Sequence, residues 1–178
     1  ILNIFPQFKF YERLKDFNKL SEELKLKYDY GLILSILVVD QTDNYDFFCY
    51  KFKTPNHIKE KLKYISSNFQ KLNNKNFYEK DSIKKLIYFN DKEKIKNILL
   101  FSRFAIKKIK DSELKNLLYY VESCNIPKFP ITGEDLKNYG YKTGQELGKK
   151  LKSLEEKWVE NNFQIDKKLV EKSLNKSN

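Results

Sequence analysis

The stretch FPITGEDLKNYGYKTGQELGKKLKSLEEKW, from Phe129 to Trp158, decides the fold of the C-terminal third of the chain. Its pattern predicts a short helix, a tight turn that contains glycine, and a long helix. The expected turn is Tyr139–Gly144, with the sequence YGYKTG. An apolar stripe links the two expected helices and consists of Leu136, Tyr139, Tyr141, Leu147, Leu151 and Leu154.

Both expected helices begin with a capping signature. Thr132 is followed three residues later by Asp135, and Thr143 is followed in the same way by Glu146. In a capping box the threonine hydroxyl accepts from a free N–H of the first turn, while the carboxylate reaches back to the cap residue. Gly140 is suited to the left-handed conformation that commonly ends a helix.

The start of the second helix has the features of a phosphate-binding site. Free backbone N–H groups and the helix dipole attract anions there. Lys142 precedes the helix, Lys149 and Lys150 lie within two turns, and Gly144 has no side chain to keep a partner away. The spacing is typical of a helix-hairpin-helix, a module that grips nucleic-acid backbone without reading bases. On spacing alone, a plain helical hairpin that needs its glycines only for the turn is the favoured alternative.

The composition favours a helix-rich globular protein. Of the 178 residues, 40% are hydrophobic and 33% are charged, with only 5 Gly and 4 Pro. Such a composition argues against a β-sandwich and against a disordered chain. Cys49 and Cys124 form no disulfide framework or metal-binding spacing, so we expect two buried thiols in a reducing compartment.

Positive charge is concentrated in the middle of the chain. The formal net charge is +11, and residues 51–110 carry 17 basic and 5 acidic side chains. Such an excess attracts polyphosphate without regard to sequence, although it also suits a merely soluble surface. The lysines considered are Lys59, Lys61, Lys63, Lys71, Lys75, Lys84, Lys85, Lys94, Lys96, Lys107 and Lys108.

The sequence also bears on location and completeness. No segment approaches the roughly 20 apolar residues of a membrane span, and no signal peptide is visible. A cytoplasmic location and no membrane partner are therefore expected. The sequence contains no methionine, so we expect it to be a piece of a longer protein or a chain whose start is missing.

Hydrophobic periodicity predicts helices along the first two thirds of the chain. The apolar run Tyr30–Val39 fits a buried helix or a buried strand, and its helical neighbours favour a helix. Thr54 is the expected cap of a helix that has Pro55 at its first position. The other expected elements are helices at residues 8–20, 21–28, 43–52 and 55–72, a polar loop at 73–80, helices capped by Asp81, by Asp91 and by Asp111 or Ser112, and a short final segment at 165–174.

No catalytic site is recognisable. His57 is the only histidine and has no nucleophile near it in sequence. The acidic pairs, such as Glu22–Glu23, are expected on solvated helix faces. The sequence contains no phosphate-binding loop and no dinucleotide fingerprint.

The C-terminal region resembles bacterial CCA-adding enzymes and poly(A) polymerases, the class II tRNA nucleotidyltransferase family. Thr143 departs from the family pattern, which usually has proline there, but threonine is also a good cap. Residues 82–88 (SIKKLIY) resemble the family's arginine-rich LRRLLY helix with lysines substituted. The matching positions are Ile131, Gly133, Asp135, Leu136, Gly140, Gly144, Leu147, Gly148, Leu151 and Trp158.

The resemblance implies an all-α fold. An irregular multi-helix body would cover residues 1–125, and a tail with a helix-hairpin-helix-like motif would cover residues 126–178. In the family, a nucleotidyltransferase head with metal-binding aspartates and a neck that selects CTP or ATP carry out the chemistry. The sequence motifs of neither the head nor the neck occur in this chain. Mg, CTP and ATP are therefore expected only in a missing head, which a separate chain could supply. Whether this chain is itself an enzyme stays open.

The resemblance also implies tRNA, or another RNA, as the partner in CCA addition or repair. Phosphate and shape readout suits an enzyme that must serve every tRNA. The expected phosphate contacts are Lys84, Lys85, Lys128, Thr132, Lys142, Thr143, Gly144, Gln145, Lys149 and Lys150. The alternatives are a DNA-binding module of the helix-hairpin-helix type and a non-catalytic interaction domain.

Overall fold

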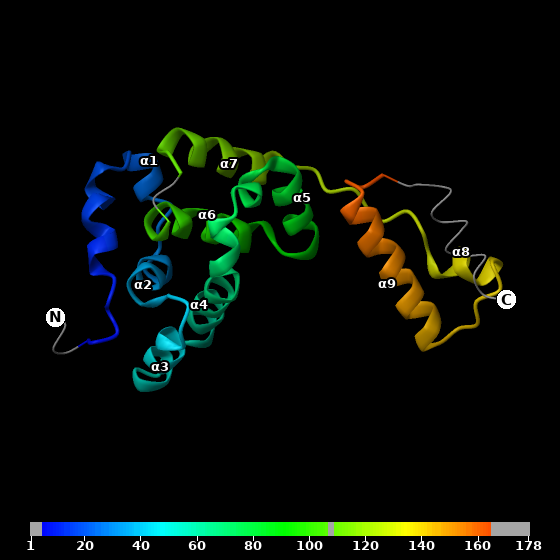
Figure 1. Ribbon diagram of the computed structural model, residues 1–178, viewed down its shortest axis with the longest axis horizontal. Coiled ribbons are helices and arrows are strands. Elements are labelled where there is room, and N and C mark those ends of the chain that lie inside the picture. Colours follow the sequence, from blue (N-terminus) through cyan, green and yellow to red (C-terminus); the bar gives the residue numbers. More distant parts are fainter. Residues whose placement is uncertain (1–4, 107–108, 165–178) are drawn as a thin grey trace. The chain divides into compact units, whose positions relative to one another are not determined.

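The computed structural model describes residues 5–106 and 109–164, and these residues form helices and turns without a strand. The predicted all-α class is therefore confirmed (Figure 1). The chain divides into a first unit, Ile1–Cys124, and a second unit, Asn125–Asn178. The expected segment at residues 165–174 lies outside the described residues.

The first unit contains seven α-helices and three 3-10 helices among its described residues. Helix α6 lies at its centre and packs against α2, α4, α5, α7 and η1. In chain order the elements are η1 (Tyr11–Lys19), α1 (Glu22–Lys25), α2 (Tyr30–Val38), α3 (Asn44–Lys51), α4 (Asn56–Asn68), η2 (Phe69–Asn73), η3 (Lys75–Tyr78), α5 (Lys80–Phe89), α6 (Lys92–Ala105) and α7 (Asp111–Ser123).

Helices α2 and α6 form the interior of the first unit because their sequences are apolar on more than one face. Along α6, Ile95, Ile98, Leu99, Phe101 and Phe104 are all almost completely buried. The apolar run that begins at residue 30 is a helix rather than a strand, as predicted. Buried serine hydroxyls in both helices donate to the carbonyl three residues earlier, which satisfies them inside the core.

The N-terminal segment differs from its prediction. A regular amphipathic helix was expected over residues 8–20, but a 3-10 helix with no buried residue forms from Tyr11. Its anchor is Arg13, whose guanidinium donates to the carbonyls of Ile36 (3.1 Å) and Val39 (2.8 Å) at the end of α2. Burial lowers the pKa of Arg13 to about 10. The segment thus caps a neighbouring helix instead of burying an apolar face.

The prediction that Thr54 caps α4 is wrong. Helix α4 begins at Asn56 after Pro55, and no side chain caps it. The backbone N–H of Thr54 donates to the carbonyl of Cys49 at 3.1 Å, so Thr54 belongs to the end of the preceding helix. Helix α4 also stops before η2, although one helix through Leu72 was expected.

Two more expected caps lie inside their helices. Helix α5 starts after Glu79, so Asp81 lies in its first turn. A carboxylate at this position still interacts favourably with the helix dipole. Asp111 is the first residue of α7, and its carboxylate accepts from Arg103 Nε at 2.5 Å. The prediction for Asp91 is confirmed, since its Oδ1 accepts from the N–H of Lys94 at 2.7 Å.

The polar loop expected at residues 73–80 is partly wrong. Its centre is the 3-10 helix η3, and Phe77 within it is 7% exposed. Asn74 caps η3 by accepting from the N–H of Asn76 at 3.0 Å. One buried aromatic ring in a polar sequence carries too weak a periodic signal to predict a helix.

The second unit contains α8 (Gly133–Asn138) and α9 (Gln145–Glu160). Leu136 and Leu154 are buried between them, and Phe129, Ile131, Tyr141, Leu147 and Leu151 pack around this pair. Tyr139 was expected in the same stripe but is 55% exposed. The sole tryptophan, Trp158, is 6% exposed and packs its ring 5.3 Å from that of Phe129.

Candidate nucleic-acid interface

The first predicted capping box, at the start of α8, is present. The N–H of Thr132 donates to Asp135 Oδ2 at 2.7 Å, and the N–H of Asp135 donates to the Thr132 hydroxyl at 3.3 Å. The hydroxyl and the N–H of Thr132 hold the pKa of Asp135 below its usual value. The N–H and the hydroxyl of Thr132 are therefore already hydrogen-bonded to Asp135 of the same chain.

A Schellman turn ends α8. The N–H of Gly140 donates to the carbonyl of Lys137 at 2.8 Å, and the N–H of Tyr141 donates to that of Leu136 at 3.2 Å. Gly140 has a φ of 90°, the left-handed conformation that the sequence predicts for it. The turn directs Tyr141 onto the apolar cluster and leaves Tyr139 in solvent, which explains why the expected stripe breaks at Tyr139.

The second predicted capping box does not form. The residue before α9 is Gly144, with a φ of 146°, and no side chain caps the helix. This backbone conformation is one that glycine adopts far more easily than threonine. Gly144 therefore takes the cap position, and Thr143 is displaced into the connection between the helices. The first N–H groups of α9 have no side-chain acceptor among the described residues.

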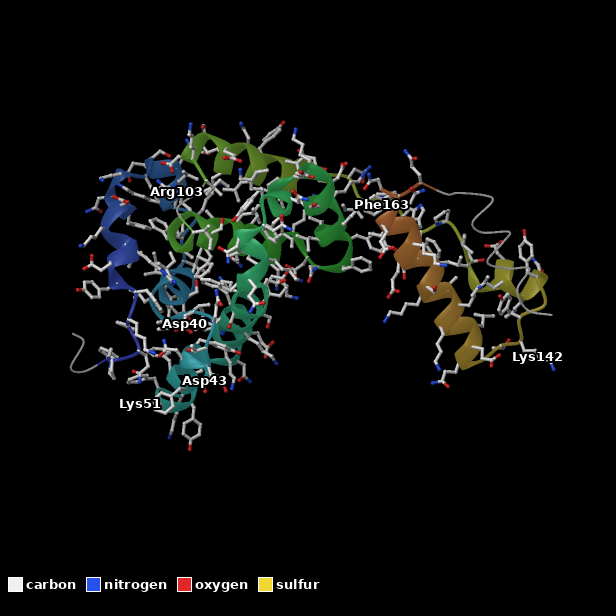
Figure 2. All side chains as sticks on the ribbon, in the orientation of Figure 1. Asp40, Asp43, Lys51, Arg103, Lys142 and Phe163 are labelled. Atoms are coloured by element: carbon white, nitrogen blue, oxygen red, sulfur yellow. The ribbon has the colours of Figure 1, made fainter. Side chains whose placement is uncertain are left out.

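The connection between α8 and α9 exposes uncompensated positive charge. Lys142 in the connection and Lys149 in α9 are exposed, and neither lies within ion-pair distance of a described carboxylate. Lys150 is half-buried, with its Nζ 5.8 Å from the centre of the Tyr141 ring. Figure 2 shows the Lys142 side chain at this connection. Lys137, in contrast, is paired with Glu134 at 2.6 Å.

The remaining predicted contacts of the second unit lie on either side of this connection. Gln145 is the first residue of α9, and Thr143 and Gly144 directly precede it. All three residues are exposed. Lys128 lies in the non-helical segment before α8 and is exposed as well. Around the start of α9, the structure therefore gathers Lys142, Thr143, Gly144, Gln145 and Lys149.

Part of the positive charge in the middle of the chain is neutralised by ion pairs in the folded structure. Lys59 is paired with Asp46 at 3.1 Å, and Lys94 is paired with Asp91 at 3.0 Å. Lys61 contacts Asp29. Lys96 contacts both Glu93 and Glu122 at 2.8 Å, while Lys107 and Lys108 lie outside the described residues. The charge excess in the sequence therefore overstates the positive surface of the first unit.

Lys84 and Lys85 belong to α5 in the first unit, whereas the other predicted contacts belong to the second unit. Both lysines are half-buried. Lys85 lines a groove of about 330 Å³ together with Lys71 and Phe89. The sequence alone did not indicate that Lys71 and Phe89 would line the same groove as Lys85. The only signal was an aromatic residue at the end of a basic amphipathic helix, and a core position would give the same signal.

The described part of the chain contains no group of three or more His, Cys, Asp and Glu residues arranged to hold a metal ion. The Nε2 atom of His57 lies 3.0 Å from the hydroxyl of Tyr30. Cys49 and Cys124 are both buried and are not joined in a disulfide, so the prediction of two buried thiols is confirmed. No helix among the described residues is long and apolar enough to cross a bilayer.

The described part of the chain is thus all-helical, and the last helix of its C-terminal unit begins beside exposed lysines. Residues 30–174 match the family described as "tRNA nucleotidyltransferase domain 2 putative". Since this match covers most of the sequence, the chain belongs to that tRNA nucleotidyltransferase family. The resemblance to the body region of CCA-adding enzymes is confirmed.

Shorter matches to known proteins agree with the family. A 61-residue stretch is 34% identical to the mitochondrial CCA tRNA nucleotidyltransferase 1 of Danio rerio, and it covers 34% of this chain and 14% of that protein. A 51-residue stretch is 35% identical to the mitochondrial CCA tRNA nucleotidyltransferase 1 of Homo sapiens, with coverage of 29% and 12%. The matches therefore span only a small part of each relative.

Proposed function

We propose that this chain is an RNA-binding portion of a tRNA nucleotidyltransferase and that it holds tRNA during CCA addition or repair at the 3′ end. Family membership supports the substrate class. The names of the relatives point to the same reaction for those proteins. The observation that carries the proposal is the start of α9, where Gly144 lies beside N–H groups and lysines that have no acidic or capping side-chain partner among the described residues.

The proposed binding mode is phosphate recognition by the connection between α8 and α9. A phosphate at the start of α9 would accept from its free backbone N–H groups and gain from the helix dipole. Because Gly144 has no side chain, the RNA backbone can come close to these groups. Lys142 and Lys149 would supply charge-assisted contacts. All of these contacts are independent of base sequence, as a protein that serves many tRNAs requires.

The nucleotide-transfer chemistry is proposed to belong to a catalytic head that another segment or chain provides. Mg and CTP or ATP would bind in that head. The described residues of this chain do not form a metal-binding cluster, so no chemical step is assigned to them. The role proposed for this chain is to position the tRNA relative to the head.

A salt titration of tRNA binding tests the proposal. Deacylated tRNA is bound at increasing salt, and duplex DNA of equal length competes. We expect the logarithm of the binding constant to fall linearly with the logarithm of the salt concentration, and tRNA to win near physiological salt. Equal competition by DNA would instead favour a generic backbone-binding module. Absence of any salt-dependent binding would refute the proposal.

A further inference from the structure

A groove in the first unit combines an exposed aromatic ring with positive charge. It lies where α5 packs against η3 and has a volume of about 330 Å³. Its apolar lining includes Phe77, Leu86 and Phe89, and its basic side chains are Lys71 and Lys85. A volume of this size is at the lower end of the range for small-ligand sites.

The exposed aromatic ring of the groove is Phe89. Phe89 is the last residue of α5 and is 57% exposed, whereas Phe77 beside it in the groove is 7% exposed. Tyr88 meets the Phe89 ring edge-on, with the ring centres 5.1 Å apart and the planes at 89°. An exposed aromatic ring next to an apolar hollow marks a surface on which a flat apolar partner can pack.

The positive charge that lines the groove favours a ligand with negative charge. No aspartate or glutamate belongs to its described lining. Lys71 donates to Asn68 Oδ1 at 3.0 Å, which is a neutral partner, so its charge is not cancelled there. A ligand suited to this groove therefore has a flat apolar face and carries negative charge a short distance away.

We infer that the groove binds an unpaired nucleotide of RNA, with its base stacked on Phe89 and its phosphate close to Lys71 and Lys85. A paired base does not suit, because its faces are covered by its neighbours in the duplex. Stacking on aromatic rings beside a basic track is the usual way in which proteins hold single strands. This inference rests on the proposed RNA-binding function and adds a second contact, which recognises single-stranded RNA.

The test combines a change in the protein with a change in the RNA, using the full chain. Phe89→Ala removes the stacking ring, and Phe89→Trp keeps one. Phe47→Ala is the matched control, because Phe47 is 55% exposed on α3 and does not line the groove. The ligands are a short uridine strand, the same strand with abasic sugars, and an RNA duplex of equal phosphate number. Circular dichroism checks that each variant is folded.

Phe89→Ala is expected to weaken binding of the uridine strand by about 5-fold or more. Binding of the abasic strand and of the duplex should change by less than about 2-fold, and Phe89→Trp should restore the loss. An equal loss on all three ligands, or no greater loss than in Phe47→Ala, would overturn the inference while leaving the proposed function intact. If the wild-type chain binds neither tRNA nor any of these ligands, both proposals fail.

Discussion

The backbone N–H of Tyr141 donates to the carbonyl of Leu136 at 3.2 Å, and this bond closes the turn that leads from α8 to Lys142. It also brings the Tyr141 ring back onto the Leu136 cluster. Lys142 is the next residue, so its exposed position follows directly from the turn. The geometry of the candidate phosphate site thus depends on a helix-ending bond and its glycine.

Gly140→Ala should lower the free energy of unfolding of the second unit by about 1 kcal/mol. A Cβ atom at Gly140 would meet nothing within 4 Å, so the cost is backbone strain at a φ of 90°. Urea unfolding followed by the fluorescence of Trp158, the sole tryptophan, reports on this unit.

Gly148→Ala is the control for that experiment. Gly148 lies within α9, and a Cβ atom there also meets nothing within 4 Å. Because alanine has the higher helix propensity, this change should stabilise the unit by up to about 1 kcal/mol. The strain argument would be wrong if Gly140→Ala were as stable as the wild type.

Lys142→Ala should weaken tRNA binding by about 1 kcal/mol and reduce the salt slope by about 1. The reason is the loss of one charge beside the start of α9 that has no ion-pair partner in the part of the chain that the structure describes. Lys137→Ala is the matched control, since its charge is already paired with Glu134. Wild-type affinity in a folded Lys142→Ala variant would remove the connection from the interface.

Replacing Lys84 and Lys85 together by glutamine should reduce the salt slope of tRNA binding by about 2. Glutamine keeps much of the aliphatic stem, which matters because both lysines are half-buried. The control replaces Lys15 and Lys19 of η1 in the same way, which removes equal charge from a helix that carries none of the predicted contacts. Equal slopes in the two double variants would show that α5 has no specific role.

The Asp29 carboxyl group should make the free energy of unfolding depend on pH in the acid range. Its Oδ1 accepts from the N–H of Leu32 at 2.7 Å, and Lys61 contacts its Oδ2. Partial burial alone would raise the pKa of Asp29, but these hydrogen bonds outweigh it and hold the pKa below its usual value. A carboxylate with a lowered folded-state pKa stabilises the fold above its unfolded pKa of about 3.9, and this contribution is lost as the pH falls below it.

Asp29→Asn should therefore be less stable than the wild type near neutral pH, and the difference should shrink below about pH 4. The free energy of unfolding should fall by about 1 kcal/mol more in Asp29→Ala than in Asp29→Asn, because asparagine can still cap α2 and alanine cannot. Urea unfolding followed by circular dichroism over a pH series measures both effects. A difference that stays constant down to about pH 3 would contradict the assignment to the Asp29 carboxylate.

The sequence by itself determined the features that depend on neighbouring residues. The helical class, the cap at Asp91, the box between Thr132 and Asp135, and the left-handed Gly140 were all predictable. Each of them rests on hydrogen bonds or dihedral preferences within one or two turns of chain. The family resemblance of the C-terminal region came from the same short-range spacing.

Only the tertiary structure decided which charges stay available and where the chain departs from local preference. Lys61 meets Asp29 across 32 positions of sequence, and Lys115 meets Glu23 across 92. Composition cannot reveal such pairs, because they form only when helices pack. The same packing places Lys71, Lys85 and Phe89 around one groove. Whether a lysine can reach a phosphate therefore depends on the folded chain, since its neighbours in space decide whether its charge is already neutralised.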